Sequence, residues 1–274
     1  MIELLAAGWC RHPEHSLISG GRWRTLTLPA GVALIRHPRL GIGLFDTGYS
    51  QRFIDATVVF PERLYRWITP PVLPSTATAV MQLAARGITP DDVRWIVLSH
   101  LHADHVAGVM DFPRARILLH RDGLVAMRQR GRWANLLQAT LPALLPDDID
   151  TRTTALADTD FTTGLWPGWH GHDLTDDGSL VIVPLPGHAA GHLGLLVRPS
   201  DGPPLFLVGD AAWTSEAIRR NLGPPRLSTV IFASASRART TLCALHGLAK
   251  NEPDLRLIPS HCPGCWPSPR HKSP

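Results

Sequence analysis

The chain has 274 residues, of which 44% are hydrophobic, and its formal net charge is +4 at pH 7. This length and apolar content suffice for a large buried core and exclude a disordered protein. No apolar run approaches the roughly 18 to 20 residues of a membrane span, and Glu3 stands where a secretory signal would be basic. We therefore expect a soluble, cytoplasmic protein with no membrane partner. The basic residues are scattered, which disfavours a nucleic-acid partner.

Hydrophobic patterning in the first half of the chain predicts short strands and helices in alternation. Two turn-forming segments, Pro-Ala-Gly and Pro-Arg-Leu-Gly, separate the first three strands that we expect. A helix should end at Gly87, and an apolar strand then runs into a cluster of histidines. The expected strands are 23–28, 32–36, 42–45, 95–98 and 115–119, and the expected helices are 76–86 and 122–130.

The second half begins with a segment, about 131–177, in which no clear periodicity remains. Its tryptophans, prolines and glycines favour an irregular excursion over a site rather than a separate domain. Two batches of strands with helices, and no linker between them, predict a single domain over 1–274 in which two sheets face each other with helices outside. The remaining expected elements are strands at 180–184, 194–198, 205–208 and 255–258 and a long helix at 228–249.

The four cysteines are Cys10, Cys243, Cys262 and Cys265. They are too few and too unevenly spaced for a disulfide framework, so we expect them to be reduced. Cys262 and Cys265 form a CxxC pair, but a zinc site would need another such pair, which the sequence lacks. We expect a tight turn there, with a disulfide as the alternative.

Histidines and aspartates stand at the ends of several predicted strands. In the segment 98–105, Leu-Ser-His-Leu-His-Ala-Asp-His, three imidazoles and a carboxylate follow an apolar strand. Side chains that leave strand ends can converge, and imidazole with carboxylate suits zinc, iron, manganese or cobalt. A histidine-rich surface turn is the alternative, since the chain has 14 histidines. It is disfavoured because three more candidate ligands each follow a predicted strand: His188, Asp210 and His261.

These residues, His100-x-His102-x-Asp104-His105 followed by His188, Asp210 and His261, resemble the ligand pattern of the metallo-β-lactamase superfamily over almost the whole chain. The segment Phe45-Asp46-Thr47-Gly48 is similar to that family's strand-end aspartate, which usually has a structural role. The resemblance implies a mixed α/β (α+β) fold, a four-layer αββα sandwich with the site at one edge of the sheets.

The same resemblance implies two divalent metal ions, which we expect to be zinc, with iron, manganese and cobalt as alternatives. One ion would be held by His100, His102 and His188, and the other by Asp104, His105 and His261, with Asp210 between them. His192, four residues after His188, is expected to support a ligand or to pack against the sheet rather than to bind metal.

The activity that the resemblance implies is hydrolysis by a hydroxide that bridges the two metals. Asp104 would orient this hydroxide and protonate the leaving group, or would serve as a ligand only. Within the superfamily, the segment 210–216, Asp-Ala-Ala-Trp-Thr-Ser-Glu, is similar to the acyl-homoserine lactonases. We therefore expect a small-molecule lactone or other carboxylic ester as the substrate. Those lactonases have a tyrosine where this chain has Trp213, a substrate-binding candidate that offers only an indole N–H donor.

Several alternatives stay open. A thioester hydrolase of glyoxalase II type would use the same ligands, although the short Pro-rich segment after His261 leaves no room for its usual glutathione-binding region. A phosphodiesterase or nuclease of the same superfamily is another alternative, and a non-catalytic metal-binding protein is a third. A persulfide dioxygenase is disfavoured because it does not need the full second set of ligands. The sequence does not fix the oligomeric state and leaves a homodimer open.

Overall fold

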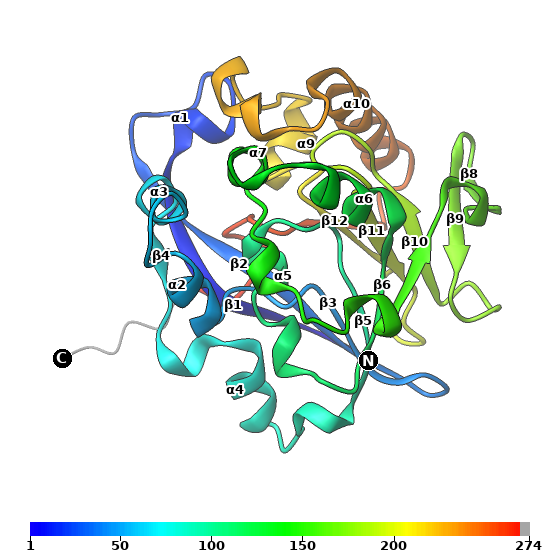
Figure 1. The fold of residues 1–274 in the computed structure, drawn as a ribbon. Helices are drawn as coiled ribbons and strands as arrows, with labels where there is room; N and C mark the ends of the chain where they lie inside the picture. The colour runs from blue at the N-terminus through cyan, green and yellow to red at the C-terminus, as the bar shows by residue number, and fades with distance from the viewer. Residues whose placement is uncertain (269–274) are drawn as a thin grey trace.

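The computed structural model describes residues 1–268 and arranges their strands in two sheets (Figure 1). Residues 269–274, the end of the Pro-rich tail, lie outside the described part. The first sheet has seven strands in the order β4-β1-β2-β3-β5-β6-β7. Its strands are β1 (Ile2–Pro13), β2 (Thr25–His37), β3 (Gly41–Phe45), β4 (Pro71–Val72), β5 (Val93–Val97), β6 (Arg116–His120) and β7 (Thr153–Leu156).

The second sheet has six strands in the order β13-β12-β11-β10-β9-β8. Neighbouring strands in this sheet are antiparallel, except that β12 and β13 run parallel. Its strands are β8 (Thr163–Trp166), β9 (Trp169–Asp173), β10 (Leu180–Pro184), β11 (Leu193–Val197), β12 (Leu205–Gly209) and β13 (Arg256–Pro259).

Helices connect and cover the strands. The α-helices are α1 (Glu14–Leu17), α2 (Gln51–Ala56), α3 (Arg63–Ile68), α4 (Ala79–Ala84), α5 (Ala103–Val106), α6 (Arg121–Gln129), α7 (Arg132–Leu137), α8 (Ile149–Arg152), α9 (Ser215–Arg220) and α10 (Ala235–Asn251). The 3-10 helices are η1 (Ser75–Ala77), η2 (Pro90–Asp92), η3 (Val109–Asp111), η4 (Pro142–Leu144), η5 (Asp158–Asp160) and η6 (Arg226–Ile231). Within residues 1–268, no helix has the length and apolar character that crossing a bilayer requires.

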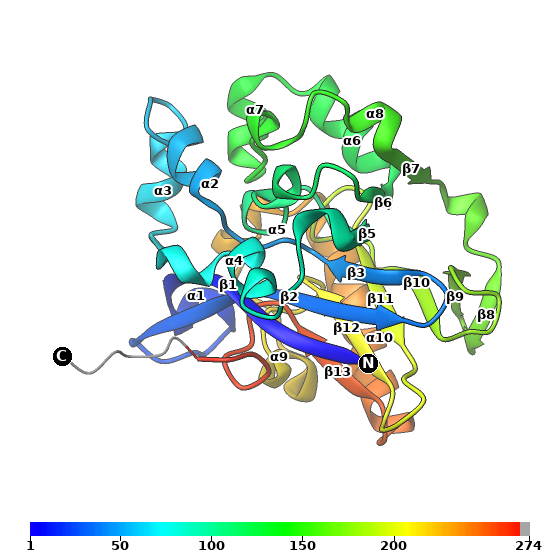
Figure 2. The same ribbon diagram turned by 90° about the horizontal axis from the view of Figure 1, so that it is seen from below.

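The alternation of side chains along the strands builds four layers. Leu205 and Leu207 of β12 point into the core between the sheets, whereas Phe206 and Val208 pack against α9 and α10. A third apolar cluster lies between the first sheet and the helices α2, α4, α5 and α6. Figure 2 shows the strands between two sets of helices, with α4 to α6 on one side and α9 on the other. The expected αββα sandwich is confirmed.

Most expected elements are confirmed to within one or two residues, but the N-terminal part was predicted wrongly. The strand β1 was not expected, nor were α1, α2 and α3. The two strands expected at 23–28 and 32–36 are one strand, β2, in which Pro29 pairs with Trp9. The register of β1 shifts between Ala6 and Trp9, where Gly8 has a positive φ of 89°. This bulge lets the hydrogen bonding between β1 and β2 continue on both sides of Pro29, which has no N–H to donate.

Two other expectations on the second half also differ from the structure. The segment 131–177 is not irregular, because it contains α7, α8 and β7 as well as the hairpin of β8 and β9. These elements are only four to six residues long, too short for a periodic signal. The helix expected at 228–249 is divided into η6 and α10, because the side chain of Ser234 accepts a hydrogen bond from Arg237 and starts α10 there.

Candidate metal centre

The candidate ligands all follow the ends of strands at one edge of the two sheets. The loop after β5 carries two of them and continues into α5 with two more, and the ends of β10, β12 and β13 each supply another. All are buried. They form two groups, each with atoms within 4.8 Å of one another: His100, His102, His188 and Asp210 in the first, and Asp104, His105 and His261 in the second.

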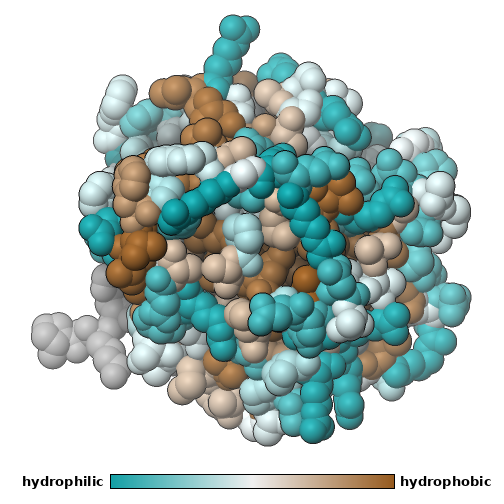
Figure 3. All heavy atoms as spheres, in the orientation of Figure 1, coloured by the Kyte–Doolittle hydropathy of each residue, from teal (hydrophilic) through white to brown (hydrophobic). Residues whose placement is uncertain are grey.

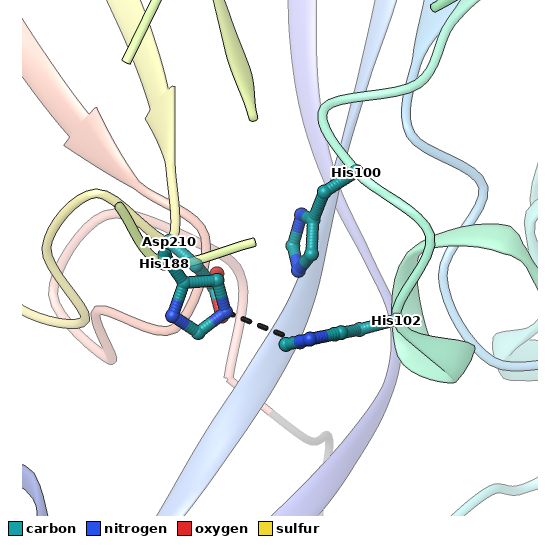
Figure 4. A group of neighbouring side chains, drawn as sticks. All are labelled: His100, His102, His188 and Asp210. Carbon is teal, nitrogen blue, oxygen red and sulfur yellow. Dashed lines mark hydrogen bonds and ion pairs between the residues drawn. The ribbon is translucent and has the colours of Figure 1, made fainter. Parts of the chain in front are cut away.

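In the first group, histidines from opposite sheets face each other (Figure 4). Nε2 of His188 lies 3.1 Å from Nδ1 of His102 and 3.2 Å from Oδ2 of Asp210. Nε2 of His100 is buried without a hydrogen-bond partner. Burial and the neighbouring imidazoles hold the pKa values of His100 and His102 well below their usual range, so both rings are neutral. Converging neutral nitrogens with free lone pairs fit a metal cation.

In the second group, carboxylates surround two histidines. Nε2 of His261 lies 3.4 Å from Oδ2 of Asp104 and 3.2 Å from Oδ2 of Asp210, and Nε2 of His105 lies 3.4 Å from Oδ1 of Asp210. Burial opposes the charged form, yet Asp210 and Asp104 raise the pKa of His261 to about 9. These carboxylates therefore favour positive charge, which a divalent cation supplies in place of protons. Asp210 contacts histidines of both groups and so lies between them.

Other buried groups orient the ligands. Asp46 lies 2.7 Å from Nδ1 of His105, and the carbonyl oxygen of Pro29 lies 2.7 Å from Nδ1 of His261. Each of these contacts leaves Nε2 of the ring for the site. His192 accepts a hydrogen bond at 3.0 Å from the backbone N–H of Asp210. His192 thus contacts the backbone of the candidate ligand Asp210 and belongs to neither candidate ligand group.

Two of the ligand loops require glycine. Gly209, just before Asp210, has a φ of 55°, and a Cβ atom there would lie 2.8 Å from Nε2 of His192. Gly187, just before His188, has a φ of 132°, and a Cβ atom there would lie 2.0 Å from the backbone nitrogen of Ala238 in α10. Any other residue would displace these loops or the helix, so local backbone geometry fixes the positions of two of the candidate ligands.

A cavity of about 420 Å³ opens onto His102, Asp104, Asp210 and His261. Figure 3 shows apolar side chains over α3 and around the hollow of this face. Much of the apolar wall comes from α3, α7 and η6. Of these, only α7 belongs to the segment 131–177 that was expected to lie over a site, and the other two were not connected with the site from the sequence. The apolar residues of the wall include Leu64, Ile68, Trp133, Leu136, Leu137, Val230 and Ile231.

Polar side chains in the cavity were also missed by the sequence analysis. Tyr65 of α3 lines the wall, and Nε2 of His12 lies 3.2 Å from Oγ1 of Thr69 beside it. Burial and the carboxylate of Asp104 raise the pKa of Tyr65 well above its usual range, so its phenol stays protonated. These residues come from β1 and the α3 region, where no motif or spacing marks them.

Trp213 lines the same cavity, half-buried. Its indole N–H donates a hydrogen bond at 3.1 Å to Oδ2 of Asp210, and its ring meets Phe232 edge-on at 5.6 Å between centroids. In this geometry the indole N–H is already bonded to the carboxylate of Asp210. The surface of Trp213 that faces the cavity is therefore chiefly apolar.

Comparison with known proteins identifies the family of this chain. The model of the metallo-beta-lactamase superfamily matches residues 32–242. The chain is 28% identical to N-acyl homoserine lactonase AttM of Azorhizobium caulinodans over 279 residues, which cover 97% of this chain and 95% of the relative. It is 28% identical to N-acyl homoserine lactonase AiiB of Agrobacterium fabrum over 208 residues, 74% of this chain and 68% of the relative.

Solved structures share the fold. An N-acyl homoserine lactone hydrolase with N-hexanoyl-L-homoserine bound at its catalytic metal centre matches with a TM-score of 0.72 and 20% identity, covering 95% of this chain and 92% of that one. The dizinc quorum-quenching lactonase AidC matches with a TM-score of 0.67 and 16% identity, covering 97% of this chain and 88% of that one.

Proposed function

The chain belongs to the metallo-beta-lactamase superfamily and is a metallo-hydrolase, and from this premise we propose that it opens lactone rings that carry an apolar substituent. The observation that carries this proposal is the position of the seven His and Asp side chains, in two groups with Asp210 between them, beside a largely apolar cavity. The relatives AttM and AiiB, named as N-acyl homoserine lactonases, support the same substrate class.

The two groups would hold two divalent ions, for which zinc is our first choice because one structural neighbour is a dizinc enzyme. His100, His102 and His188 would hold one ion, and Asp104, His105 and His261 the other, with Asp210 shared. When bound, such a pair supplies an ionised water as the nucleophile and polarises the carbonyl oxygen of the substrate.

Asp104 is the carboxylate that we assign to proton movement. It lines the cavity, unlike His105, and its Oδ2 lies 3.4 Å from Nε2 of His261. A carboxylate at the boundary between ligands and substrate can accept a proton from the nucleophile and pass it to the leaving alkoxide of the opened ring. Asp104 is therefore proposed both as a ligand and as the general acid.

Tyr65 is the donor that we assign to the substrate carbonyl. The indole N–H of Trp213 already donates a hydrogen bond to Asp210. Tyr65, whose phenol is protonated, lines a different wall of the same cavity. A few polar groups in an otherwise apolar pocket fix the orientation of a ligand. The apolar residues of α3, α7 and η6 would then contact the substituent of the lactone.

A substrate panel on zinc-loaded protein tests this function. The panel contains acyl-homoserine lactones of increasing chain length, simple lactones, S-lactoylglutathione and bis-p-nitrophenyl phosphate. We expect lactone hydrolysis to have the highest kcat/KM and to rise with the length of the acyl chain. Preferred turnover of the thioester or of the phosphodiester would replace the lactonase assignment by that class, and no turnover at all would favour a non-catalytic metal-binding protein.

A further inference from the structure

The turn that follows His261 carries two free cysteines, Cys262 and Cys265. The backbone N–H of Cys265 donates a hydrogen bond at 3.0 Å to the carbonyl oxygen of Cys262. A four-residue turn closed in this way keeps its first and last Cα atoms within about 7 Å. Disulfides span Cα separations of about 4.4 to 6.8 Å, so this turn already has the dimensions of a disulfide loop.

The two thiols also share one neighbour. Oγ of Ser215 lies 3.3 Å from Sγ of Cys262 and 3.3 Å from Sγ of Cys265. Both sulfur atoms therefore contact the same hydroxyl group. Cys262 is buried, whereas Cys265 is partly exposed. A small oxidant in solution can therefore reach Cys265, and Cys262 is positioned behind it to complete the reaction.

The pair adjoins the candidate metal centre in the chain. Cys262 directly follows His261, and the backbone N–H of Ser215 donates to Sγ of Cys262 at 3.4 Å. Ser215 begins α9, two residues after Trp213. The Cys262 thiol thus joins the His261 turn to the start of α9.

We propose that Cys262 and Cys265 are a redox modification site that small disulfides convert to an intramolecular disulfide, and that this conversion weakens metal binding at His261. With oxidised glutathione, the partly exposed Cys265 sulfur attacks one sulfur atom, and its proton leaves with the released glutathione as a thiol. Cys262 then attacks Sγ of Cys265 and releases the second. The protein loses two hydrogen atoms, and one oxidised glutathione becomes two reduced molecules.

The expected effect on the metal comes from a change in the residues directly after His261. Disulfide formation removes the proton of each thiol, so neither sulfur atom can donate to Oγ of Ser215, and it draws the two sulfur atoms together in the turn that follows His261. Groups that orient metal ligands typically contribute about 10- to 100-fold to metal affinity. We expect about tenfold weaker binding of one of two zinc equivalents. This part rests on the proposed function, whereas disulfide formation does not.

The test uses the full chain with Cys243→Ser, which removes an exposed thiol that could join two molecules. The protein is equilibrated in glutathione buffers of increasing oxidised fraction. Its free thiols are then blocked by alkylation, and the mass of the intact protein is measured by mass spectrometry. We expect a species that carries no glutathione, has two fewer alkyl groups than the reduced protein and has lost two hydrogen atoms through disulfide formation. The matched variant Cys243→Ser/Cys265→Ser should never give it. Glutathione adducts alone, or no change in mass, would overturn the proposal.

Competition with a chromophoric chelator then measures zinc in the reduced and oxidised forms. The oxidised form should release one equivalent at about tenfold lower chelator concentration, while glutathione treatment should leave the Cys265→Ser variant unchanged. Equal retention in both forms would overturn the coupling to His261. If the reduced protein binds no zinc, the proposed function and the coupling both fail, and the mass measurement still decides whether the disulfide forms.

Discussion

Asp46 and His105 form a buried pair in which Oδ2 of the carboxylate lies 2.7 Å from Nδ1 of the ring. Asp46 also accepts hydrogen bonds from the backbone N–H of Ser99 at 2.7 Å and from its hydroxyl at 2.8 Å. The strand-end aspartate after β3 thus holds both the ring of a candidate ligand and the start of the ligand loop. Its structural role, expected from the sequence, has a direct connection to the metal centre.

We expect Asp46→Asn to weaken the binding of one metal equivalent by about 10- to 100-fold, because the amide cannot stabilise the His105 ring as the carboxylate does. Isothermal titration of apo protein with zinc would show one site weakened and the other largely unchanged. Asp55→Asn, on the exposed surface of α2, is the control and should change neither. Unchanged zinc binding in Asp46→Asn would show that the pair does not support the site.

The convergence of the candidate ligands could be predicted because they follow apolar strands, and strand ends at one sheet edge lie close together. His100, His188, Asp210 and His261 all obey this rule. The cavity was not predictable in the same way. Tyr65 and Leu136 reach it from short helices, six residues each, whose sequences show no pattern that relates one helix to the other.

Pro29 shows why the N-terminal strands were predicted wrongly. A Pro-Ala-Gly segment is typical of a turn, yet here it lies inside β2, opposite the bulge of β1. Its carbonyl oxygen faces His261, a contact that joins residues 232 positions apart in the sequence. Such a long-range contact leaves no local signal.

Removal of the phenol of Tyr65 tests the substrate-binding part of the proposal. Tyr65→Phe should lower kcat/KM for the preferred lactone about tenfold, the loss of about 1.4 kcal/mol from one hydrogen bond in the transition state. The chain's other tyrosine provides the control, since Tyr49 is fully buried and lies outside the cavity wall. Equal effects of Tyr65→Phe and Tyr49→Phe on kcat/KM would contradict a specific role of Tyr65.

The close packing of the His188 loop on α10 predicts a large loss of stability for Gly187→Ala. The added Cβ would lie 2.0 Å from the nitrogen of Ala238, and we expect a loss of about 3 kcal/mol in the free energy of unfolding. Gly247→Ala in the same helix meets nothing within 4 Å and should stabilise the protein by about 0.5 to 1 kcal/mol. Urea unfolding of both variants checks this pair; similar stabilities would mean that the loop is not constrained by α10.

Metal removal should destabilise the fold as a whole. A ligand that binds only the folded state at about 1,000 times its Kd adds about 4 kcal/mol to the free energy of unfolding. Dialysis against a chelator should therefore lower Tm by roughly 8 °C or more, and zinc, but not calcium, should restore it, because the site offers imidazole nitrogens that calcium does not favour. A Tm that does not respond to the chelator would argue against metal bound in the core.

The number of metal ions tests the central claim most directly. Inductively coupled plasma mass spectrometry of the purified wild type, reconstituted with zinc and freed of loosely bound ions, should give close to two equivalents per chain. His105→Ala should lose one equivalent and retain the other, since His100, His102 and His188 form a separate group. A single equivalent in the wild type, or the same count in wild type and His105→Ala, would contradict a dinuclear centre.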